Sequence, residues 1–408
     1  MELFSSLTEQ PLQLLIPVFS AVIGWVTNVL AVKMMFQPIE FVGIKPFLGW
    51  QGIIPGNALR LANTGIKLVT ERLLNVHELF ESFQPKTFVA GQEARLREVT
   101  EKVVEQKAAE LFPAMWGALS PQIKEQVMTM AHTEVSSMSE RVLIEARERI
   151  GELLDVQRIV TRAVQEDKEL MGRIFQRVGS AEFKFIERSG LYFGFLFGLI
   201  QLMVWLVYTK GWVLPFFGFV VGYATNWLAL KLIFEPKSVI NVGPFTFQGL
   251  FHRRQKEISR EFADVMSARI LTSESLFREL STGQSREILI EIVQRRGEEV
   301  ISKYQSHPMM ASMLKGAALE SVKTEIMSQV ETEMFAEGGF LYAFADKSEE
   351  IRQTLAERMS VMEATAFEDV LRPAFRQDEW KLILAGAVLG LAAGMLQLAY
   401  LFGDLVSL

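Results

Sequence analysis

Two copies of a Thr-Asn pair, each followed five residues after the Asn by a lysine, are the residues best placed to do chemistry. Each copy lies within an apolar stretch of the chain. Hydroxyl and amide groups can hold a polar headgroup, and a lysine ammonium attracts phosphate or carboxylate. This predicts a ligand-binding role for these residues, which are Thr27, Asn28, Lys33, Thr225, Asn226 and Lys231.

The two Asn side chains need hydrogen-bond partners, because an unpaired amide in hydrocarbon is costly. We expect Gln201 and Gln397, on two other apolar segments, to supply them. One interpretation is that the Thr-Asn pairs only join helices. A second is a polar ligand site near a pseudo-two-fold axis, and a third is a local break in the helix backbone.

The lysines also have two interpretations. Near a helix end a lysine can extend its ammonium to the lipid headgroups, which makes it an ordinary membrane anchor. Alternatively Lys33 and Lys231 contact an anionic headgroup, helped by Arg253 and Arg254 further along the chain. The segments 46–55 and 244–252, rich in Phe, Trp and Gly, are expected at the membrane interface.

Glycines recur at four-residue steps in two of the apolar segments and accompany the Thr-Asn pairs in the other two. Small residues at this spacing let membrane helices approach closely. The spacing leaves open whether they pack within the chain or between protomers. The predicted helix-packing residues are Gly24, Gly190, Gly194, Gly198, Gly222, Gly386, Gly390 and Gly394.

These residues are positioned by four charge-poor stretches, each long enough to cross a bilayer. They predict transmembrane helices over 12–36, 190–208, 212–234 and 382–403. The first is too long for a cleavable signal and has no basic residue before it. The intervening 37–189 and 235–381 show helical periodicity and no useful strand pattern. The sequence predicts an all-α integral membrane protein with two long helical soluble domains.

The two halves of the chain resemble each other over their length. Residues 24–38 and 222–236 are identical at 8 of 15 positions, and residues 182–186 align with 379–383. We interpret residues 1–208 and 209–408 as repeats from a tandem duplication. Two spans per repeat make the repeats parallel, related by an axis along the membrane normal.

Lysines and arginines predict the orientation. Lys210 is alone among the predicted short loop and the two tails, whereas the other basic residues lie in or next to the soluble domains. By the positive-inside rule we expect the soluble domains to face the cytoplasm and both termini to lie on the outer side of the membrane.

Composition excludes several classes of function. The chain has no cysteine, and its four histidines are scattered, so no metal site and no cofactor are expected. A net charge of -6 argues against a nucleic-acid partner. No catalytic motif is present, so we expect a protein that is not an enzyme and has no catalytic residues.

The first motif resembles a known family. The run Gly-x-x-Thr-Asn-x-x-Ala-x-Lys-Met-x-Phe-x-Pro over 24–38, followed by Pro46-Phe47 and by the Gly-Ile-Ile-Pro of 52–55, is similar to the bacterial membrane-protein family called domain of unknown function 445. The resemblance implies a fold and a location in the bacterial inner membrane but no activity. The family typically has basic residues directly after the Gly-x-Ile-Pro turn, but this chain has Gly, Asn and Ala at 56–58. The second half keeps basic residues at the equivalent place, in 252–256.

Two functions from different classes remain. The first is non-enzymatic binding or transfer of an anionic lipid or similar amphiphile, with membrane lipids as partners. The second is a scaffold, as a homo-oligomer, whose cytoplasmic helices recruit a protein partner. A specific co-purified lipid would favour the first function.

Overall fold

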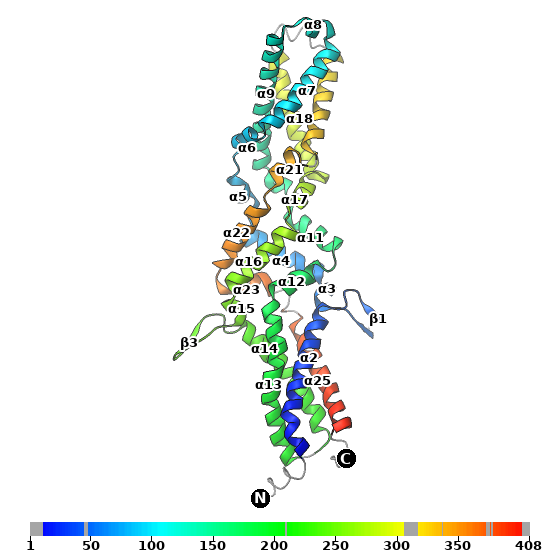
Figure 1. Cartoon of the computed structure of the whole chain (residues 1–408), viewed down its shortest axis with the longest axis vertical. Coiled ribbons are helices and arrows are strands. Elements are labelled where there is room, and N and C mark those ends of the chain that lie inside the picture. The colour runs from blue at the N-terminus through cyan, green and yellow to red at the C-terminus, as the bar shows by residue number, and fades with distance from the viewer. Residues whose placement is uncertain are drawn as a thin grey trace. The chain divides into compact units, whose positions relative to one another are not determined.

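The computed structural model describes residues 11–44, 48–208, 210–305, 317–336, 338–372, 376 and 378–401. The chain forms two compact units, and each takes residues from both halves of the sequence. Unit 1 comprises residues 1–69, 160–265 and 355–408, and unit 2 comprises 70–159 and 266–354. Each unit is therefore assembled from segments far apart in the chain (Figure 1).

Helices make up nearly all of the described structure in the first half of the chain. Its elements are η1 (Pro11–Leu15), α2 (Ile16–Phe36), β1 (Val42–Ile44), β2 (Leu48–Trp50), α3 (Ile53–Gly56), α4 (Ala58–Arg72), α5 (Val76–Glu81), α6 (Pro85–Gly91), α7 (Glu93–Leu111), α8 (Pro113–Ala118), α9 (Pro121–Glu148), α10 (Ile150–Leu153), α11 (Val156–Glu166), α12 (Leu170–Val178) and α13 (Ser180–Val207).

The second half is also largely helical. Its elements are α14 (Val213–Phe234), β3 (Ile240–Val242), β4 (Phe245–Phe247), α15 (Leu250–Arg253), α16 (Gln255–Arg269), α17 (Ser273–Leu280), α18 (Gly283–Gln305), α20 (Ala317–Met334), α21 (Phe340–Ala345), α22 (Ser348–Ser360), α23 (Ala364–Leu371) and α25 (Glu379–Leu401). In both halves a long apolar helix is followed by a hairpin, a four-residue helix and a 15-residue helix.

Four helices of unit 1 are long and apolar enough to cross a membrane, as the sequence predicts. They cover Gln13–Phe36, Ser180–Val207, Val213–Phe234 and Glu379–Tyr400. The second begins ten residues before the predicted 190, since the helix continues through charged residues that a purely apolar criterion excludes. The prediction of an all-α membrane protein therefore agrees with the structure, apart from two short hairpins that the sequence does not predict.

The four spans form two antiparallel pairs, α2 with α13 and α14 with α25, and α2 also contacts α14. At one end of this bundle the starts of α2 and α14 meet the end of α13. Ile16, Trp205, Val213 and Leu214 form a buried apolar core there. The opposite end, where α2 and α14 finish, carries the candidate site.

Each of α2 and α14 ends two residues before a proline, and a hairpin follows that proline. The Gln37–Pro38 and Glu235–Pro236 peptide bonds are both cis. Strands β1 and β2 pair antiparallel, as do β3 and β4. Each hairpin closes on its proline, because Gly52 N donates to Pro38 O at 2.9 Å and Gly249 N donates to Pro236 O at 2.9 Å.

Unit 2 is built around a closed four-helix arrangement. Helix α7 packs on α9, α9 on α18, α18 on α20, and α20 on α7. Ion pairs join these helices, among them Arg296 Nε to Glu145 Oε2 at 3.0 Å and Lys323 Nζ to Glu298 Oε1 at 2.6 Å. Helices α7 and α9 come from the first half of the chain and α18 and α20 from the second.

Candidate functional site

The two Thr-Asn pairs meet inside the span bundle. Thr27 is 2% exposed, and Asn28, Thr225 and Asn226 are fully buried. The Thr225 hydroxyl donates to Asn28 Oδ1 at 3.4 Å, which links α14 to α2. Both helices run unbroken through the motif, so the structure gives no backbone break here.

Backbone carbonyls, and not glutamines, accept from the Asn amides. Asn28 Nδ2 donates to Ile186 O at 2.7 Å, and Asn226 Nδ2 donates to Leu382 O at 3.1 Å. The expected pairing with Gln201 and Gln397 is therefore wrong.

The reason for this difference is the antiparallel register of the helices. Asn28 faces the start of α13, whereas Gln201 lies further along α13, where its Oε1 accepts from the Ser20 hydroxyl at 2.8 Å. Among the atoms of described residues, Asn226 Oδ1 and Gln397 Nε2 are buried and have no hydrogen-bond partner.

Glycines let the two helices of each pair approach closely. A Cβ built on Gly194 would lie 2.6 Å from Ser20 O, and one on Gly394 would lie 2.6 Å from Leu214 O. All eight predicted packing glycines lie at the contact between α2 and α13 or between α14 and α25. Their close contacts are thus made within one chain.

The predicted lysines point elsewhere. Lys33 and Lys231 are exposed, and five residues of helix turn each of them away from the buried Asn on the same helix. Lys231 Nζ lies 5.1 Å from the centre of the Trp227 ring and 3.9 Å from Glu235 Oε2. The structure brings the Thr-Asn pairs together but does not add the lysines to them.

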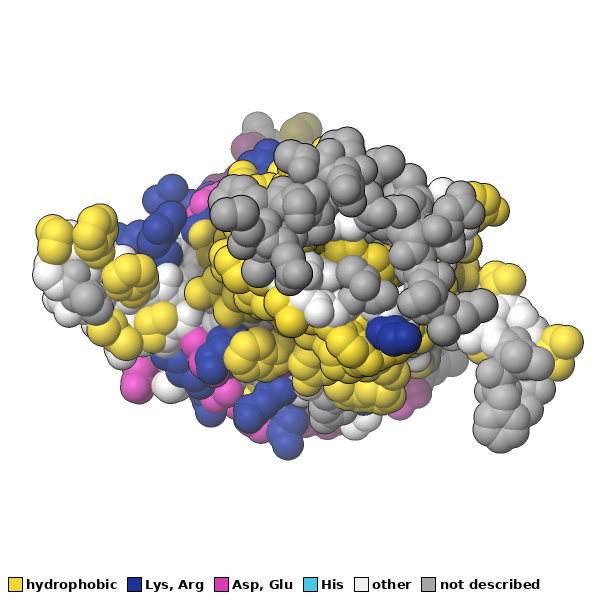
Figure 2. Space-filling model, turned by 90° about the horizontal axis from the view of Figure 1, so that it is seen from below, with side chains coloured by type: hydrophobic (Ala, Val, Ile, Leu, Met, Phe, Trp, Pro, Cys, Tyr) yellow, Lys and Arg dark blue, Asp and Glu magenta, His cyan; other side chains and the backbone are white. Residues whose placement is uncertain are grey.

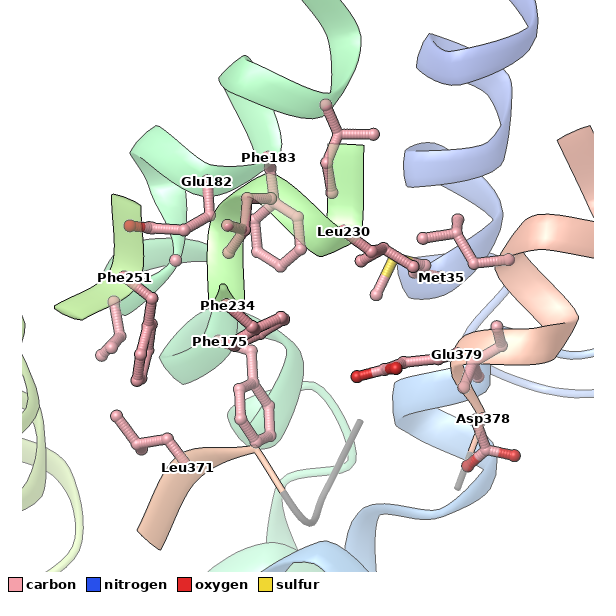
Figure 3. A pocket seen from close by; sticks show the side chains of 16 residues that line it. Met35, Phe175, Glu182, Phe183, Leu230, Phe234, Phe251, Leu371, Asp378 and Glu379 are labelled. Atoms are coloured by element: carbon pink, nitrogen blue, oxygen red, sulfur yellow. The ribbon is translucent and has the colours of Figure 1, made fainter. Parts of the chain in front are cut away.

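A pocket opens between the four spans at the end where α2 and α14 finish (Figure 3). Its cavity volume is about 70 Å³, and it is lined mainly by apolar side chains from all four spans and from α3, α12, α15 and α23. In Figure 3 the Glu379 side chain points into this space. The lining residues are Met35, Ile53, Phe175, Val178, Gly179, Glu182, Phe183, Ile186, Leu230, Ile233, Phe234, Phe251, Leu371, Asp378, Glu379 and Leu382.

Two of the pocket's carboxylates are held by residues from the opposite half of the chain. Arg254 Nη1 donates to both oxygens of Glu182 at 2.7 Å. Arg60 Nη2 donates to Asp378 Oδ2 at 2.6 Å, and the Asn57 amide lies 3.4 Å from the same oxygen. In each half, the segment that follows the hairpin therefore forms an ion pair with the start of a span from the other half, α13 or α25.

The electrostatic surroundings keep Arg254 charged. Hydrogen bonds to Glu257 and to Glu182 raise the pKa of Arg254 above its already high ordinary value. Its side chain is 15% exposed and that of Glu182 is 7% exposed. Arg253, predicted as its companion, is exposed. The two arginines therefore have different surroundings, although they are adjacent in sequence.

A second buried ionic cluster lies beside the pocket around Glu368. Arg372 binds Glu368, and its Nε donates to Glu379 Oε1 at 3.0 Å. Lys237 Nζ is 3.0 Å from Glu368 Oε2, and His252 Nε2 is 3.5 Å from the same oxygen. This cluster links the loop after α14 to α15, α23 and α25.

Burial and charge set the protonation of this cluster. Burial lowers the pKa of His252, and the attraction of Glu368 opposes this only in part. Burial alone would raise the pKa of Glu368, but hydrogen bonds from Arg372 and Lys237 bring it below its ordinary value. Near neutral pH, His252 is therefore uncharged and Glu368 is ionised.

The pocket and the two cross-half ion pairs were not predicted from the sequence. A signal was present, because the ends 182–186 and 379–383 align between the halves. The Asn hydrogen bonds show that Ile186 and Leu382 are equivalent in the two halves. Glu182 therefore corresponds to Asp378 and not to Glu379, which differs from the sequence alignment by one residue.

Comparison with known proteins finds relatives among bacterial membrane proteins. The chain is 32% identical over 120 residues to a UPF0754 membrane protein of Bacillus cereus (strain AH187), which is 28% of this chain and 32% of the relative. A UPF0754 membrane protein of Bacillus thuringiensis subsp. konkukian (strain 97-27) matches to the same extent. One from Shouchella clausii (strain KSM-K16) is 31% identical over 116 residues, 28% of each chain.

These matches cover about a third or less of each relative's length, and the printed names give a membrane location and no activity. No family model matches the chain, so the resemblance to domain of unknown function 445 stays a prediction. No solved structure matches either. Together with the four apolar helices, the relatives support a bacterial membrane protein similar to UPF0754 membrane proteins.

Proposed function

We propose that the protein binds and transfers an anionic lipid or a similar amphiphile at the cytoplasmic surface of the bacterial inner membrane. The pocket between the span ends carries this proposal. Side chains from all four spans line it, and most of them are apolar. Such a lining suits the end of a hydrocarbon chain, because concave apolar cavities are the usual sites for small apolar groups.

The polar end of the ligand would lie at the same end of the bundle. The ion pairs of Glu182 and Asp378 mark the charged edge of the pocket, and Lys33, Lys231 and Arg253 are exposed on the elements around it. Each basic residue near a membrane surface adds about 1 kcal/mol of attraction for anionic lipid. We therefore assign the predicted basic residues to headgroup attraction and the pocket to the chain.

Binding without catalysis is part of the proposal, because the sequence carries no catalytic motif. The buried Thr-Asn pairs then act as a rigid support for the pocket. Their hydrogen bonds to Ile186 O and Leu382 O fix the starts of α13 and α25, and Glu182 and Glu379 on these two helices line the pocket.

We also propose that the two halves arose by tandem duplication and are parallel repeats. Each half has a buried Asn whose amide donates to a backbone carbonyl of that half's second span, α13 or α25. Each also has a hairpin closed on a proline, and an ion pair to the other half. A two-fold relation would place the pocket on the axis, where one ligand meets both halves.

The orientation can be tested by fusion. A reporter active only outside the cytoplasm should be active after Leu408 and silent when inserted near Gly297, because basic residues gather on the soluble-domain side. The opposite pattern would place the pocket on the outer side of the membrane and overturn the assignment to the cytoplasmic surface.

The binding proposal is tested by filling the pocket. Leu230 lines it, whereas Leu232, two residues along α14, is 42% exposed on the bundle surface. Mass spectrometry of the purified wild-type protein should find one lipid class enriched over the bulk membrane. Leu230→Trp should lose that enrichment, and the matched control Leu232→Trp should keep it.

Two outcomes would contradict the binding proposal. One is a folded Leu230→Trp variant with the same enriched lipid as the wild-type protein. The other is a wild-type protein that carries only the bulk lipid mixture, and this outcome would favour the scaffold.

The scaffold remains the second candidate because unit 2 has exposed apolar residues. Met115 on α8 is 43% exposed, and Ile123 and Met130 on α9 are 45% and 58% exposed. Apolar residues on a helical surface serve as a docking site, for a protein or for a second copy of the chain, when they form a contiguous patch. Loss of a co-purified protein, or of the oligomer, in a Met115→Ser, Met130→Ser variant would support this role.

A further inference from the structure

The hairpin formed by β3 and β4 has one apolar face and one polar face. Ile240 pairs with Phe247, and Phe245 lies two residues before Phe247 on the same strand, so these three share a face. They are 48%, 53% and 66% exposed, respectively. Asn241 pairs with Thr246 on the opposite face. The apolar face of this hairpin is therefore exposed.

The hairpin formed by β1 and β2 also has an exposed apolar face. Val42 and Ile44 share a face and are 63% and 74% exposed. Gly43 pairs with Gly49 on the other face, which the Phe41 ring covers so closely that a Cβ on Gly49 would lie 2.7 Å from one of its atoms. The apolar face is again the open one.

Both hairpins are fixed to the ends of the spans. Trp50 Nε1 donates to Met34 O in the last turn of α2 at 3.2 Å, and Gln51 Nε2 donates to Ile39 O at 2.8 Å. In the other half, Gln248 Nε2 donates to Lys237 O at 3.2 Å. The hairpins project from the span bundle to opposite sides (Figure 1), and Figure 2 shows hydrophobic side chains on both of them.

We propose that each hairpin lies on the lipid leaflet at this end of the spans and inserts its apolar face among the lipids. The proposal rests on the four helices crossing the membrane and not on the pocket binding a ligand. It assigns a membrane-contacting surface to residues outside the spans.

Continuity with the surface of the spans selects lipid as the partner. The last turns of α14 carry exposed Trp227 and Leu232, at 45% and 42%, and the hairpin begins six residues after α14 ends. Tryptophan near a helix end is typical of the lipid-water interface. A surface that starts at this level and extends sideways from the bundle runs along the membrane plane, where its apolar face meets lipid.

The test uses single cysteines, because the chain contains none. Phe247→Cys places a probe on the apolar face, and the adjacent Thr246→Cys is the matched control on the polar face. Each is labelled with the fluorophore NBD and reconstituted into vesicles of phosphatidylethanolamine and phosphatidylglycerol. Quenching by lipids with a doxyl group near the headgroup, and by aqueous iodide, is then measured.

We expect NBD at position 247 to be quenched by doxyl lipid at least twofold more than NBD at position 246. Iodide should show the reverse order. Val42→Cys should behave like Phe247→Cys, which would show that both hairpins contact lipid.

Two results would overturn the proposal. Equal quenching at positions 246 and 247 would mean that the hairpin has no lipid-facing side. Protection from both doxyl lipid and iodide at position 247 would mean that protein covers the apolar face, either a second copy of the chain or a different partner. Neither result depends on whether a lipid co-purifies, so failure here is distinguishable from failure of the binding proposal.

Discussion

Replacing Arg254 with methionine would leave the Glu182 carboxylate buried without its main partner. Glu182 accepts both of its described hydrogen bonds from Arg254 Nη1, and its side chain is 7% exposed. Methionine keeps most of the side-chain length and apolar volume of arginine, so the main loss is the charge and its donors. The variant therefore isolates the ion pair that joins the two halves of unit 1.

The size of the effect follows from burial. Removing one partner of a buried ion pair costs about 3–5 kcal/mol, because the remaining charge is uncompensated. The contact between Arg254 and Glu257 adds little, since Glu257 is 61% exposed. With an unfolding entropy of about 2 cal/mol/K per residue, this loss lowers the melting temperature of a chain this long by about 4–6 °C.

The assay is thermal unfolding of the purified protein in detergent, followed by intrinsic tryptophan fluorescence. Arg253→Met is the matched control, because Arg253 is adjacent in sequence and exposed; its melting temperature should change by less than about 1 °C. Adding Glu182→Gln to Arg254→Met removes the orphaned charge. The double variant should recover part of the lost stability.

A loss in Arg254→Met no larger than that in Arg253→Met would refute the reasoning. So would a double variant whose loss equals the sum of the losses measured for Arg254→Met alone and for Glu182→Gln alone, because independent residues add and coupled residues do not. Arg60→Met should be milder than Arg254→Met. Arg60 is 41% exposed, and Asp378 keeps Lys381, whose Nζ lies 2.6 Å from Oδ1.

Three further predictions concern packing, polar contacts and pH. Gly194→Leu should disrupt the contact of α2 with α13 and lower the yield of folded protein by several-fold, whereas Gly91→Leu, where a Cβ meets open space, should leave it nearly unchanged; size-exclusion chromatography measures this. Asn28→Ala should lower stability in detergent by about 0.6–2 kcal/mol, and Lys33→Gln should do almost nothing to folding but reduce retained anionic lipid; equal effects in both assays would contradict the separation of roles. The melting temperature should fall between about pH 7.5 and pH 5.5, because the lowered pKa of buried His252 lets the unfolded chain bind a proton that the folded chain does not; His252→Gln should flatten this dependence, and an unchanged slope would exclude His252 as its cause.

Much of the span region could be predicted from the sequence, because a bilayer imposes a length and a polarity that can be read locally. The four helices lie where charge-poor stretches predict them, and the largest error is at Ser180, where α13 begins earlier. Helix periodicity likewise predicts the helical character of unit 2. The three-residue strands β1 and β3 escaped prediction because they are too short for a period-two pattern to be distinguished.

The candidate site could be predicted only in part. Burial of the two Asn residues follows from the cost of an unpaired amide in lipid, but their acceptors do not follow from the sequence. Any residue on a neighbouring helix was a candidate, and Gln201 was the wrong choice because the antiparallel register places it opposite Ser20. Backbone carbonyls, which every residue has, leave no sequence signal.

The sequence by itself determined that the chain has four apolar helices, a helical remainder and two matching sets of Thr, Asn and Gly residues. These features depend on local composition and spacing. They can be predicted because the preference of a segment for water or lipid is set by its own residues. The tertiary structure alone decided that Arg254 meets Glu182 and that Arg60 meets Asp378, across 72 and 318 residues of chain. Such pairings, and the pocket between them, depend on the register and packing of distant helices, which no single segment encodes.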